Sequence, residues 1–321
     1  MTVIVDRWAP LGVTIAEHEI ASLLIDPRDP NVLIAGLLNK GVFLTRDRGA
    51  SWIDLECPSN EPECLARDAG DPDVLWVGQG SGVLRRAADG SWSTPLNADT
   101  IDTSGKPVVL SLREHHVGCA RDTLGQAWTY VVSSYGTVYR SNDGGASWDH
   151  VFGELGVTNG GFALAIVLRE GDAPVAYFTS EKAYHRGVIG PFPSGFERIA
   201  PETLAGPDEL YSIARGNKLW IGTDWGLYAV DESTNIATQQ PCDPGDSFAL
   251  AVSPHDPRRV IVAGKRGMPC VTYDDGATWR ELRDGVSTAL YAHCLVWSAH
   301  DPDVVYMGAE EGSVFAITLA R

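Results

Sequence analysis

The chain of 321 residues is poor in positive charge and has no long apolar run. It carries 25 Lys+Arg against 42 Asp+Glu, a formal net charge of −17. A field of that sign repels nucleic acid and anionic membranes. No stretch approaches the roughly 18 apolar residues of a membrane helix, and the opening residues MTVIVDRWAPLG lack the basic head and apolar centre of a secretory signal. We therefore expect a cytoplasmic protein that binds neither nucleic acid nor a membrane.

Several familiar signatures are also missing. The chain has no Gly-x-Ser-x-Gly elbow, no P-loop, no His-Glu-x-x-His and no helical period of useful length. Its six cysteines match no standard zinc spacing, and a cytoplasmic chain keeps them reduced. Cys57 and Cys64 are close enough in sequence to form a disulfide or bind a metal, whereas Cys119 and Cys242 have no assigned role. The chain therefore lacks the sequence evidence that most often identifies an esterase, a nucleotide-binding protein or a metalloprotease.

What the chain does have is a repeated Asp-Gly-rich segment. It reads TRDRGASW at 45–52, SNDGGASW at 141–148 and TYDDGATW at 272–279. The first two copies start 96 residues apart, which is 2 × 48, and the next start lies 131 residues further on, close to 3 × 44. A unit of 44 to 48 residues is the length of a four-stranded propeller blade.

A second repeated pattern describes the strands. In four places an apolar strand leads into a turn that ends in Asp-Pro, and a Val/Ile-rich strand then leads into Gly: 22–36, 64–78, 249–264 and 294–308. Pro and Asp favour turns, and β-branched runs favour buried strands. The sequence predicts an all-β, seven-bladed β-propeller of four-stranded antiparallel blades in one domain, 1–321. The expected blades are 16–56, 61–97, 106–153, 160–200, 209–240, 246–283 and 290–319, with residues 2–9 completing the last one.

The three Asp-Gly segments match Ser/Thr-x-Asp-x-Gly-x-Ser/Thr-Trp, and a shortened AADGSW ends at Trp92. In these residues the chain resembles the BNR/Asp-box repeat propellers, which include sialidases, sortilin-type receptor ectodomains and photosystem II assembly factors. The resemblance implies the propeller fold over nearly the whole chain. The Arg-Ile-Pro motif and three-arginine clamp of sialidases are absent, so sialidase activity is not implied. The basic patch and export signal usual for photosystem assembly factors are absent as well.

The Asp-Gly segments are better suited to holding the fold than to binding calcium. A short hairpin with Gly in a strained conformation lets Asp accept backbone amide bonds, and the Trp can fill space between blades. None of the three segments has the ligand spacing of an EF-hand loop. The resemblance places these boxes between the third and fourth strands, on the face opposite the loops that enter the inner strands.

The channel mouth is therefore the expected site. Aligned inner strands place Glu19, Glu61, Lys106, Gly160, Glu209, Asp246 and Tyr291 at one position, and Ala21, Glu63, Val108, Phe162, Tyr211, Phe248 and His293 two residues later. Because strand side chains alternate, both sets face the same way. Joining loops add Tyr184, His185, Asp224, Trp225, Lys265, Arg266, Glu310 and Glu311, and His18 precedes Glu19. Arg113–His116, by contrast, is expected to form a solvated turn.

Two functions fit this ring. In the first, it binds a small polar molecule or a metal ion. Glu19, Glu209, Asp246 and His293 are the candidate catalytic groups for acid–base or metal-assisted hydrolysis, elimination or rearrangement. The expected ligand-binding residues are His18, Glu61, Lys106, Tyr184, His185, Tyr211, Asp224, Trp225, Phe248, Arg266 and Tyr291. A divalent ion is the candidate cofactor, held by Glu19, Glu61, Asp246 and His293. In the second, the acidic face docks a basic protein without any chemistry.

Overall fold

The computed structural model describes residues 6–11, 18–108, 110, 115–133, 136–153, 164–167, 175–180, 183–188, 196–204, 209–287, 290–310 and 312–320. The strands form seven four-stranded antiparallel sheets, as predicted, and we number them as blades 1 to 7 along the chain. They belong to two compact units. The first contains residues 1–60 and 201–321, and the second contains 61–200. No helix in the described part of the chain is long and apolar enough to cross a membrane.

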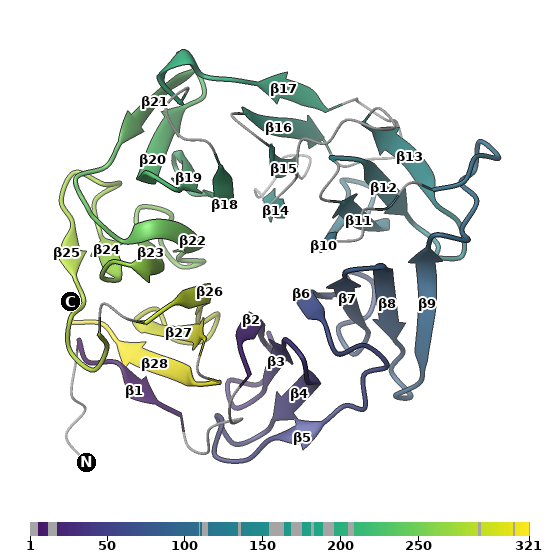
Figure 1. The fold of residues 1–321 in the computed structure, drawn as a ribbon, viewed down its shortest axis with the longest axis horizontal. Coiled ribbons are helices and arrows are strands. Elements are labelled where there is room, and N and C mark those ends of the chain that lie inside the picture. The colour runs from purple at the N-terminus through teal and green to yellow at the C-terminus, as the bar shows by residue number, and fades with distance from the viewer. Residues whose placement is uncertain are drawn as a thin grey trace. The chain divides into compact units, whose positions relative to one another are not determined.

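The first unit contains blades 1, 5, 6 and 7 (Figure 1). Blade 1 comprises β2 (Ile20–Ile25), β3 (Leu33–Leu37), β4 (Gly41–Thr45) and β5 (Ile53–Asp54), and blade 5 comprises β18 (Leu210–Arg215), β19 (Leu219–Thr223), β20 (Gly226–Asp231) and β21 (Ile236–Gln239). Blade 6 comprises β22 (Gly245–Val252), β23 (Val260–Arg266), β24 (Cys270–Thr272) and β25 (Arg280–Glu281), and blade 7 comprises β26 (Ala292–Trp297), β27 (Val304–Ala309), β28 (Val314–Thr318) and β1 (Ala9–Pro10). The inner strands β18, β22, β26 and β2 contact one another in succession.

The second unit contains blades 2, 3 and 4. Blade 2 comprises β6 (Pro62–Arg67), β7 (Leu75–Gln79), β8 (Gly82–Arg86) and β9 (Trp92–Asn97), and blade 3 comprises β10 (His115–Arg121), β11 (Ala127–Ser133), β12 (Val138–Ser141) and β13 (Asp149–Phe152). Blade 4 comprises β14 (Leu164–Val167), β15 (Val175–Ser180), β16 (Ala183–Val188) and β17 (Glu197–Ile199). A single 3-10 turn, η1 (Glu202–Leu204), is the one helix in the described residues, and it belongs to the first unit.

The three Asp boxes (45–52, 141–148 and 272–279) lie between the third and fourth strands of blades 1, 3 and 6, as predicted. In the second box, Asp143 accepts hydrogen bonds from Ser141 Oγ at 2.8 Å, Ser147 N at 3.0 Å and Ser147 Oγ. Ser141 Oγ in turn accepts the amide of Gly145 at 2.9 Å. The other two boxes repeat this set of bonds. Each loop is therefore closed on itself by its own side chains.

Each box also packs against the preceding blade of its unit. Trp148 of blade 3 is buried edge-on against Trp76 of blade 2, with ring centroids 6.1 Å apart, and its Nε1 donates to Pro95 O at 2.8 Å. Trp279 of blade 6 meets Trp220 of blade 5 in the same way at 5.9 Å. Burial of such large rings is a substantial part of the apolar contact between blades. The boxes thus join neighbouring blades as well as closing hairpins.

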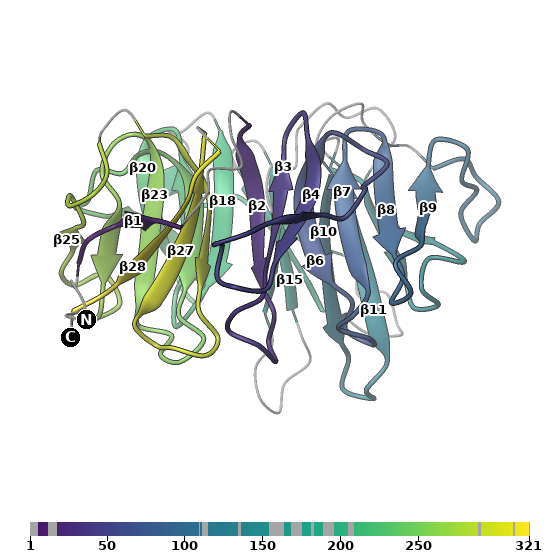
Figure 2. The same cartoon turned by 90° about the horizontal axis from the view of Figure 1, so that it is seen from below.

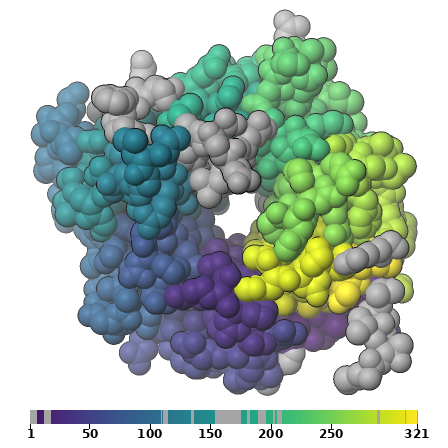
Figure 3. All heavy atoms as spheres, turned by 180° about the vertical axis from the view of Figure 1, so that it is seen from behind, coloured from purple at the N-terminus to yellow at the C-terminus, as the bar shows by residue number. Residues whose placement is uncertain are grey.

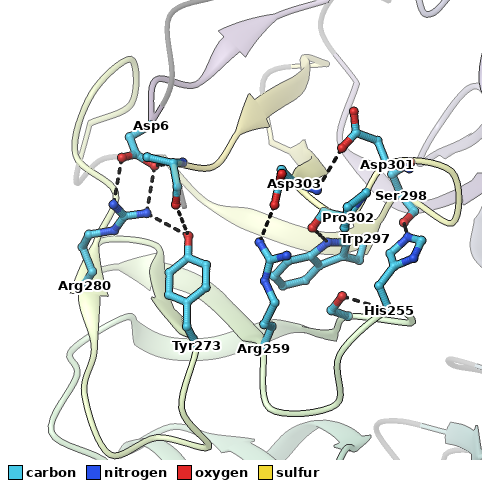
Figure 4. Close-up of polar contacts among 12 residues, drawn as sticks. Asp6, His255, Arg259, Tyr273, Arg280, Trp297, Ser298, Asp301, Pro302 and Asp303 are labelled. Carbon is cyan, nitrogen blue, oxygen red and sulfur yellow. Dashed lines mark hydrogen bonds and ion pairs between the residues drawn. The ribbon is translucent and has the colours of Figure 1, made fainter.

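Polar contacts add to this packing between blades 6 and 7 (Figure 4). Arg259 donates to Asp303 Oδ1 at 3.0 Å, and its guanidinium lies 5.0 Å from the ring centroids of both Tyr273 and Trp297. In the Asp-Pro turn, His255 Nε2 lies 3.0 Å from Ser298 O. His300 repeats that contact between blades 7 and 1 by approaching the Asp26 carbonyl at 2.8 Å. Each of these two histidines thus links its turn to the next blade of the unit.

The last blade is completed by the N-terminal strand, as predicted. β1 pairs with β28, so that segments from the two ends of the chain lie side by side (Figure 2). The pairing involves Ala9 and Pro10, and the Asp6 amide extends it by donating to Thr318 O at 2.8 Å. Residues 2–5 of the expected strand lie outside the described residues. The surfaces of blades 1 and 7 also meet, as the purple and yellow atoms of Figure 3 show.

Candidate functional site

The inner strands share a β-bulge near their entry. The register shifts between Ile20 and Ser22 in blade 1, Pro62 and Cys64 in blade 2, Leu210 and Ser212 in blade 5, Asp246 and Ala249 in blade 6, and Ala292 and Cys294 in blade 7. The extra residue is Ala21 in blade 1, Glu63 in blade 2, Tyr211 in blade 5 and His293 in blade 7. In blade 6 the irregular residues are 247–248. A bulge redirects the side chain that it carries. The second of the two aligned positions is therefore where five inner strands bend.

In the first unit, four predicted side chains form a connected row. His293 Nε2 lies 2.9 Å from Glu19 Oε1, within ion-pair distance but outside hydrogen-bond geometry. The His293 ring lies against Tyr291, with centroids 4.0 Å apart. Lys265 Nζ lies 4.6 Å from the centroid of the same Tyr291 ring. The row thus runs from a carboxylate through an imidazole and a phenol to an ammonium group.

A second group lies at the entry of blade 5. Tyr211 donates a 2.5 Å hydrogen bond from its hydroxyl to Glu209 Oε2, and the Glu209 amide approaches Asp224 Oδ1 at 3.4 Å. Burial raises the pKa of Tyr211 above its usual range, and the hydrogen bond to Glu209 and the charges of Glu209, Asp224 and Asp246 raise it further. The phenol is therefore held neutral as a hydrogen-bond donor among carboxylates.

Asp246 and Lys265 connect the two groups. They are paired residues on β22 and β23, and a backbone bridge pairs Lys265 with Tyr291. Asp246 also acts on Tyr211 through its charge. We call the eight residues the strand-entry cluster: Glu19, Glu209, Tyr211, Asp224, Asp246, Lys265, Tyr291 and His293. All eight belong to one compact unit.

Four other predicted residues of this unit lie at its margins. Trp225 occupies the two-residue turn between β19 and β20 and is 55% exposed, whereas Arg266 ends β23 with an exposed side chain and a φ of 68°. His18 is half-buried just before Glu19. Phe248 lies on β22, and its side chain is not among those described. Of these four predicted ligand-binding residues, Trp225 presents a large aromatic side chain to solvent.

In blade 3 the structure differs from the expected alignment. The inner strand starts at His115, whereas Lys106 lies in an exposed turn, where its amide donates to Asp102 Oδ1 at 2.9 Å. Val108 is buried in the core. The turn forms there because Asp102 also accepts hydrogen bonds from Ser104, which closes the loop locally. Lys106 is thus not on an inner strand. Gly160 and Phe162 of blade 4 lie outside the described residues.

Tyr184 and His185 also differ from expectation. They were expected in a joining loop, but they lie on β16 and are buried. His185 stacks on Phe178, with centroids 4.3 Å apart and rings 1° from parallel. Burial lowers the pKa of His185 to about 4, and the Arg198 charge lowers it further. Both side chains therefore belong to the packed interior. They lie on the strand itself because Ala183, paired with Ser180, is the first residue of β16 after the turn.

The histidines of Arg113–His116 were expected in a solvated turn and instead begin β10. His115 is fully buried, with Nδ1 2.5 Å from Gln79 O, and its amide donates to Glu63 Oε2 at 3.2 Å. Burial lowers the pKa of both His115 and His116 to about 4. Glu61 is exposed just before β6 in the same unit. Glu63 and His115 are thus a polar pair that the alignment missed, because it set blade 3 nine residues too early.

The predicted metal set does not come together. Among the described residues, no three His, Cys, Asp or Glu side chains are grouped so that they could hold a metal ion. Glu19, Asp246 and His293, which belong to one unit, are therefore not grouped as metal ligands among the described residues, and Glu61 belongs to the other unit. The strand-entry cluster offers carboxylates, a neutral phenol, an imidazole and an ammonium group. Those groups suit hydrogen bonding, charge pairing and proton transfer.

No family model matches the chain. Among curated proteins, the photosystem II assembly lipoprotein Ycf48 of Synechococcus sp. (strain CC9902) is 24% identical over 259 residues, which are 79% of this chain and 67% of that protein. A probable oligoxyloglucan-reducing end-specific xyloglucanase of Neosartorya fischeri is 22% identical over 308 residues, which are 86% of this chain and 36% of that protein. The chain thus spans about a third of the xyloglucanase.

Solved structures agree on the fold. The chain matches "YCF48 bound to D1 peptide" with a TM-score of 0.69 at 16% identity, covering 98% of this chain and 95% of that one. It matches the GH74 enzyme of Niastella koreensis with a TM-score of 0.69 at 13% identity, covering 96% of this chain and 53% of that one. The protein is a seven-bladed β-propeller. Within that class it resembles Ycf48 and the GH74 xyloglucanases, which share the fold but not a function.

Proposed function

We propose that the strand-entry cluster binds a small polar molecule and that His293 and Glu19 transfer a proton within it. The observation that carries this proposal is the 2.9 Å contact between His293 Nε2 and Glu19 Oε1 at the end of a row that includes Tyr291 and Lys265. The His293 side chain is 13% exposed and that of Glu19 is 31% exposed, so both can meet a molecule from solvent.

The cluster provides the parts of an acid–base site. A carboxylate beside an imidazole orients the ring and stabilises its protonated form. Lys265, on the other side of Tyr291, supplies positive charge that can hold an anionic group or a developing oxyanion. The Tyr211 hydroxyl donates its proton to Glu209 and can accept a hydrogen bond from the ligand, and Trp225 offers a flat apolar surface for part of the ligand. The reaction classes that need only these groups are hydrolysis, elimination and rearrangement through proton transfer.

The names of the relatives indicate which ligands to test first. One is a probable xyloglucanase, and carbohydrates are small polar molecules that such a cluster suits. The first test is therefore binding of xyloglucan oligosaccharides, followed by small carboxylic acids and amines, measured by thermal shift and calorimetry. We expect a ligand that raises the melting temperature of the wild type, with at least tenfold weaker binding to His293→Asn and Glu19→Gln.

Arg258→Ala is the matched control, because Arg258 lies in an exposed Asp-Pro turn and pairs with Asp256. It should bind like the wild type. Turnover of the bound ligand that is lost in His293→Asn, with binding reduced less than turnover, supports proton transfer. A ligand that binds all three variants and the wild type equally would place its site elsewhere and reject the proposal.

A second candidate function is a scaffold that docks a basic protein without chemistry. Two observations favour it: the net charge of −17, and the likeness to a structure of Ycf48 bound to D1 peptide. Such docking would weaken steeply with salt, because exposed charges are screened beyond about 10 Å at 0.1 M ionic strength. Binding of a lysine-rich peptide at 50 mM and 500 mM NaCl separates the two functions. Strong salt dependence that is unchanged by His293→Asn supports the scaffold.

A further inference from the structure

Cys242 and Cys270 are brought together by the way blade 6 begins. The ladder between β22 and β23 pairs Gly245 with Arg266, and the Met268 amide continues it by donating to Asp243 O at 3.3 Å. Following this antiparallel alignment by one more residue places Cys242 beside Pro269, next to Cys270 at the start of β24. The two thiols are thus adjacent although 28 positions separate them in sequence.

The side chains complete the contact. Cys242 packs against the apolar cluster that contains Cys270, Trp220 and Val262, and its thiol interacts with that of Cys270. Cys270 is fully buried, and its Sγ approaches Met268 O at 3.3 Å. Cys242 is partly exposed. The Cys242 thiol can therefore react with a reagent from solvent, and the buried Cys270 thiol lies next to it.

We infer that Cys242 and Cys270 are a redox pair that closes to a disulfide by exchange with a small-molecule disulfide. The Cys242 thiolate attacks one sulfur of the reagent, forms a mixed disulfide and releases one small thiol. The Cys270 thiolate then attacks Cys242 Sγ and releases the second small thiol. Two protein thiols and one small disulfide thus become one protein disulfide and two small thiols, and the two protons of the protein thiols end on the small thiols.

The other thiols are arranged differently. Cys64 and Cys119 are also partly exposed and interact with each other, and burial raises the pKa of Cys64 to about 11. Cys294 is partly exposed as well, and burial raises its pKa to about 12. Cys57 is partly exposed, but its pKa is raised by burial and no other thiol is adjacent to it among the described residues. The thiols of Cys64 and Cys119 donate to Val117 O and Thr129 Oγ1, each at 3.6 Å, whereas the thiol of Cys242 interacts with that of Cys270.

The closed disulfide would join two segments that lead to the strand-entry cluster. Cys242 lies four residues before Asp246, and Cys270 lies five residues after Lys265. A bond between them ties the segment before β22 to the start of β24. It would therefore reduce the freedom of Asp246 and Lys265 relative to each other, whatever the cluster binds. The redox pair does not depend on the proposed function.

The rate of closure should depend strongly on pH. The hydrogen bond to Cys270, burial and the charge of Asp243 all raise the pKa of Cys242 above its usual value. Little thiolate is then present at pH 7, and the thiolate is the attacking species. The rate should rise by about tenfold per pH unit between pH 7 and 9. Disulfide formation between Cys242 and Cys270 is thus slow at pH 7 and requires sustained exposure to the oxidant.

The test uses the full chain with oxidised glutathione at pH 7 and pH 8.5. Free thiols are counted over time, and tryptic peptides are mapped without reduction. Trypsin separates the two cysteines, because it cuts after Lys218, Arg258, Arg266 and Arg280. We expect two of the six thiols to disappear, a linked pair of peptides 219–258 and 267–280, faster closure at pH 8.5, and a melting temperature raised by roughly 2 to 5 °C.

Variants decide the assignment. Cys242→Ser and Cys242→Ala should both abolish the linked peptides, whereas Cys57→Ser should leave them unchanged. A product that stops as glutathione bound to Cys242 would overturn the proposal, as would a disulfide that joins Cys242 to any other cysteine. Retention of all six thiols at pH 8.5 in protein that keeps its wild-type melting temperature would overturn it as well.

Discussion

His293 of blade 7 and Glu19 of blade 1 lie 2.9 Å apart although 274 positions separate them in sequence. We predict an energetic coupling of about 0.5 to 1 kcal/mol between them, because both side chains are partly exposed. A double-mutant cycle with His293→Asn and Glu19→Gln, followed by urea unfolding, measures it. The coupling should fall in 1 M NaCl. Glu310→Gln, an exposed carboxylate whose amide donates to Tyr291 O, should show no coupling with His293→Asn.

Gly145 and Gly144 in the second Asp box form a matched pair. Both have positive φ, +90° and +72°. A Cβ on Gly145 would lie 2.7 Å from Pro95 Cβ and 3.0 Å from Trp76 Cη2, whereas at Gly144 the nearest atom is 3.9 Å away. Gly145→Ala should therefore cost about 2 to 4 kcal/mol of unfolding free energy and Gly144→Ala about 1 kcal/mol. Equal losses in chemical unfolding would mean that the packing against blade 2 contributes nothing.

The box aspartates predict a pH dependence of stability. Hydrogen bonds from Ser51, and then Thr45, lower the pKa of Asp47 from 3.8 to about 2. A carboxylate with a depressed pKa in the folded protein stabilises the fold above its unfolded pKa, and that stability is lost as pH falls from about 4 to about 2. Asp47→Asn should thus be less stable than the wild type at pH 5, and the difference should shrink at pH 3.

Urea unfolding at pH 5, 4 and 3 measures that difference. Asp99→Asn is the control, because Asp99 is exposed outside the complete boxes, and its stability should differ from the wild type by the same small amount at all three values. A constant difference between Asp47→Asn and the wild type across this range would contradict the prediction, since it would show that the Asp47 charge makes no net contribution.

Arg280 fastens the N-terminal strand. Its Nη1 and Nη2 lie 2.8 and 2.9 Å from the two Asp6 carboxylate oxygens, and Asp6 Oδ1 also accepts the Ala320 amide at 2.9 Å (Figure 4). Asp6→Asn should cost about 1 kcal/mol and speed amide exchange in β28, the partner of β1. Arg258→Ala, which breaks a more exposed ion pair, should change exchange in β28 little. Unchanged β28 exchange in Asp6→Asn would show that the strand is held by its backbone bonds alone.

Much of the fold could be predicted because its signals are local. An Asp box closes with hydrogen bonds spanning at most four positions, so the motif is visible wherever it occurs and marks the hairpin between the third and fourth strands. The Asp-Pro turns behave likewise. Counting these local units was sufficient to predict seven four-stranded sheets and the completion of the last blade by the N-terminal strand.

The inner strand of blade 3 was misplaced, although a signal for it exists. Ala-Arg-Asp ends at Asp68 in blade 2 and again at Asp122 in blade 3. The structure gives both aspartates one role: Asp68 accepts the indole NH of Trp76 at 2.8 Å, and Asp122 accepts that of Trp128 at 2.9 Å. Aligning on this pair would have placed His115 at the start of the strand. The blade length alone predicts a strand that starts near Lys106. The segment between β9, which ends at Asn97, and β10 is longer than that estimate allows, so the strand starts at His115.

The contacts within the candidate site were harder to foresee. The ring positions identified Glu19, Tyr291 and His293 as neighbours of the site, but not their order in a row with Lys265. That order depends on the β-bulge in β26 and on the bridge between Lys265 and Tyr291. Neither has a sequence signature, because both depend on how adjacent blades pack.

The pairing of β1 with β28 also has a consequence for synthesis. Ala9 and Pro10 are synthesised long before their partners Phe315 and Ala316. Until those partners are made, blade 7 has no fourth strand, and the segment that contains Ala9 and Pro10 has no sheet to join. Forming a pairing of such long sequence separation is slow, because a very large loop must close first. Completion of blade 7 therefore has to wait until β28 has been made.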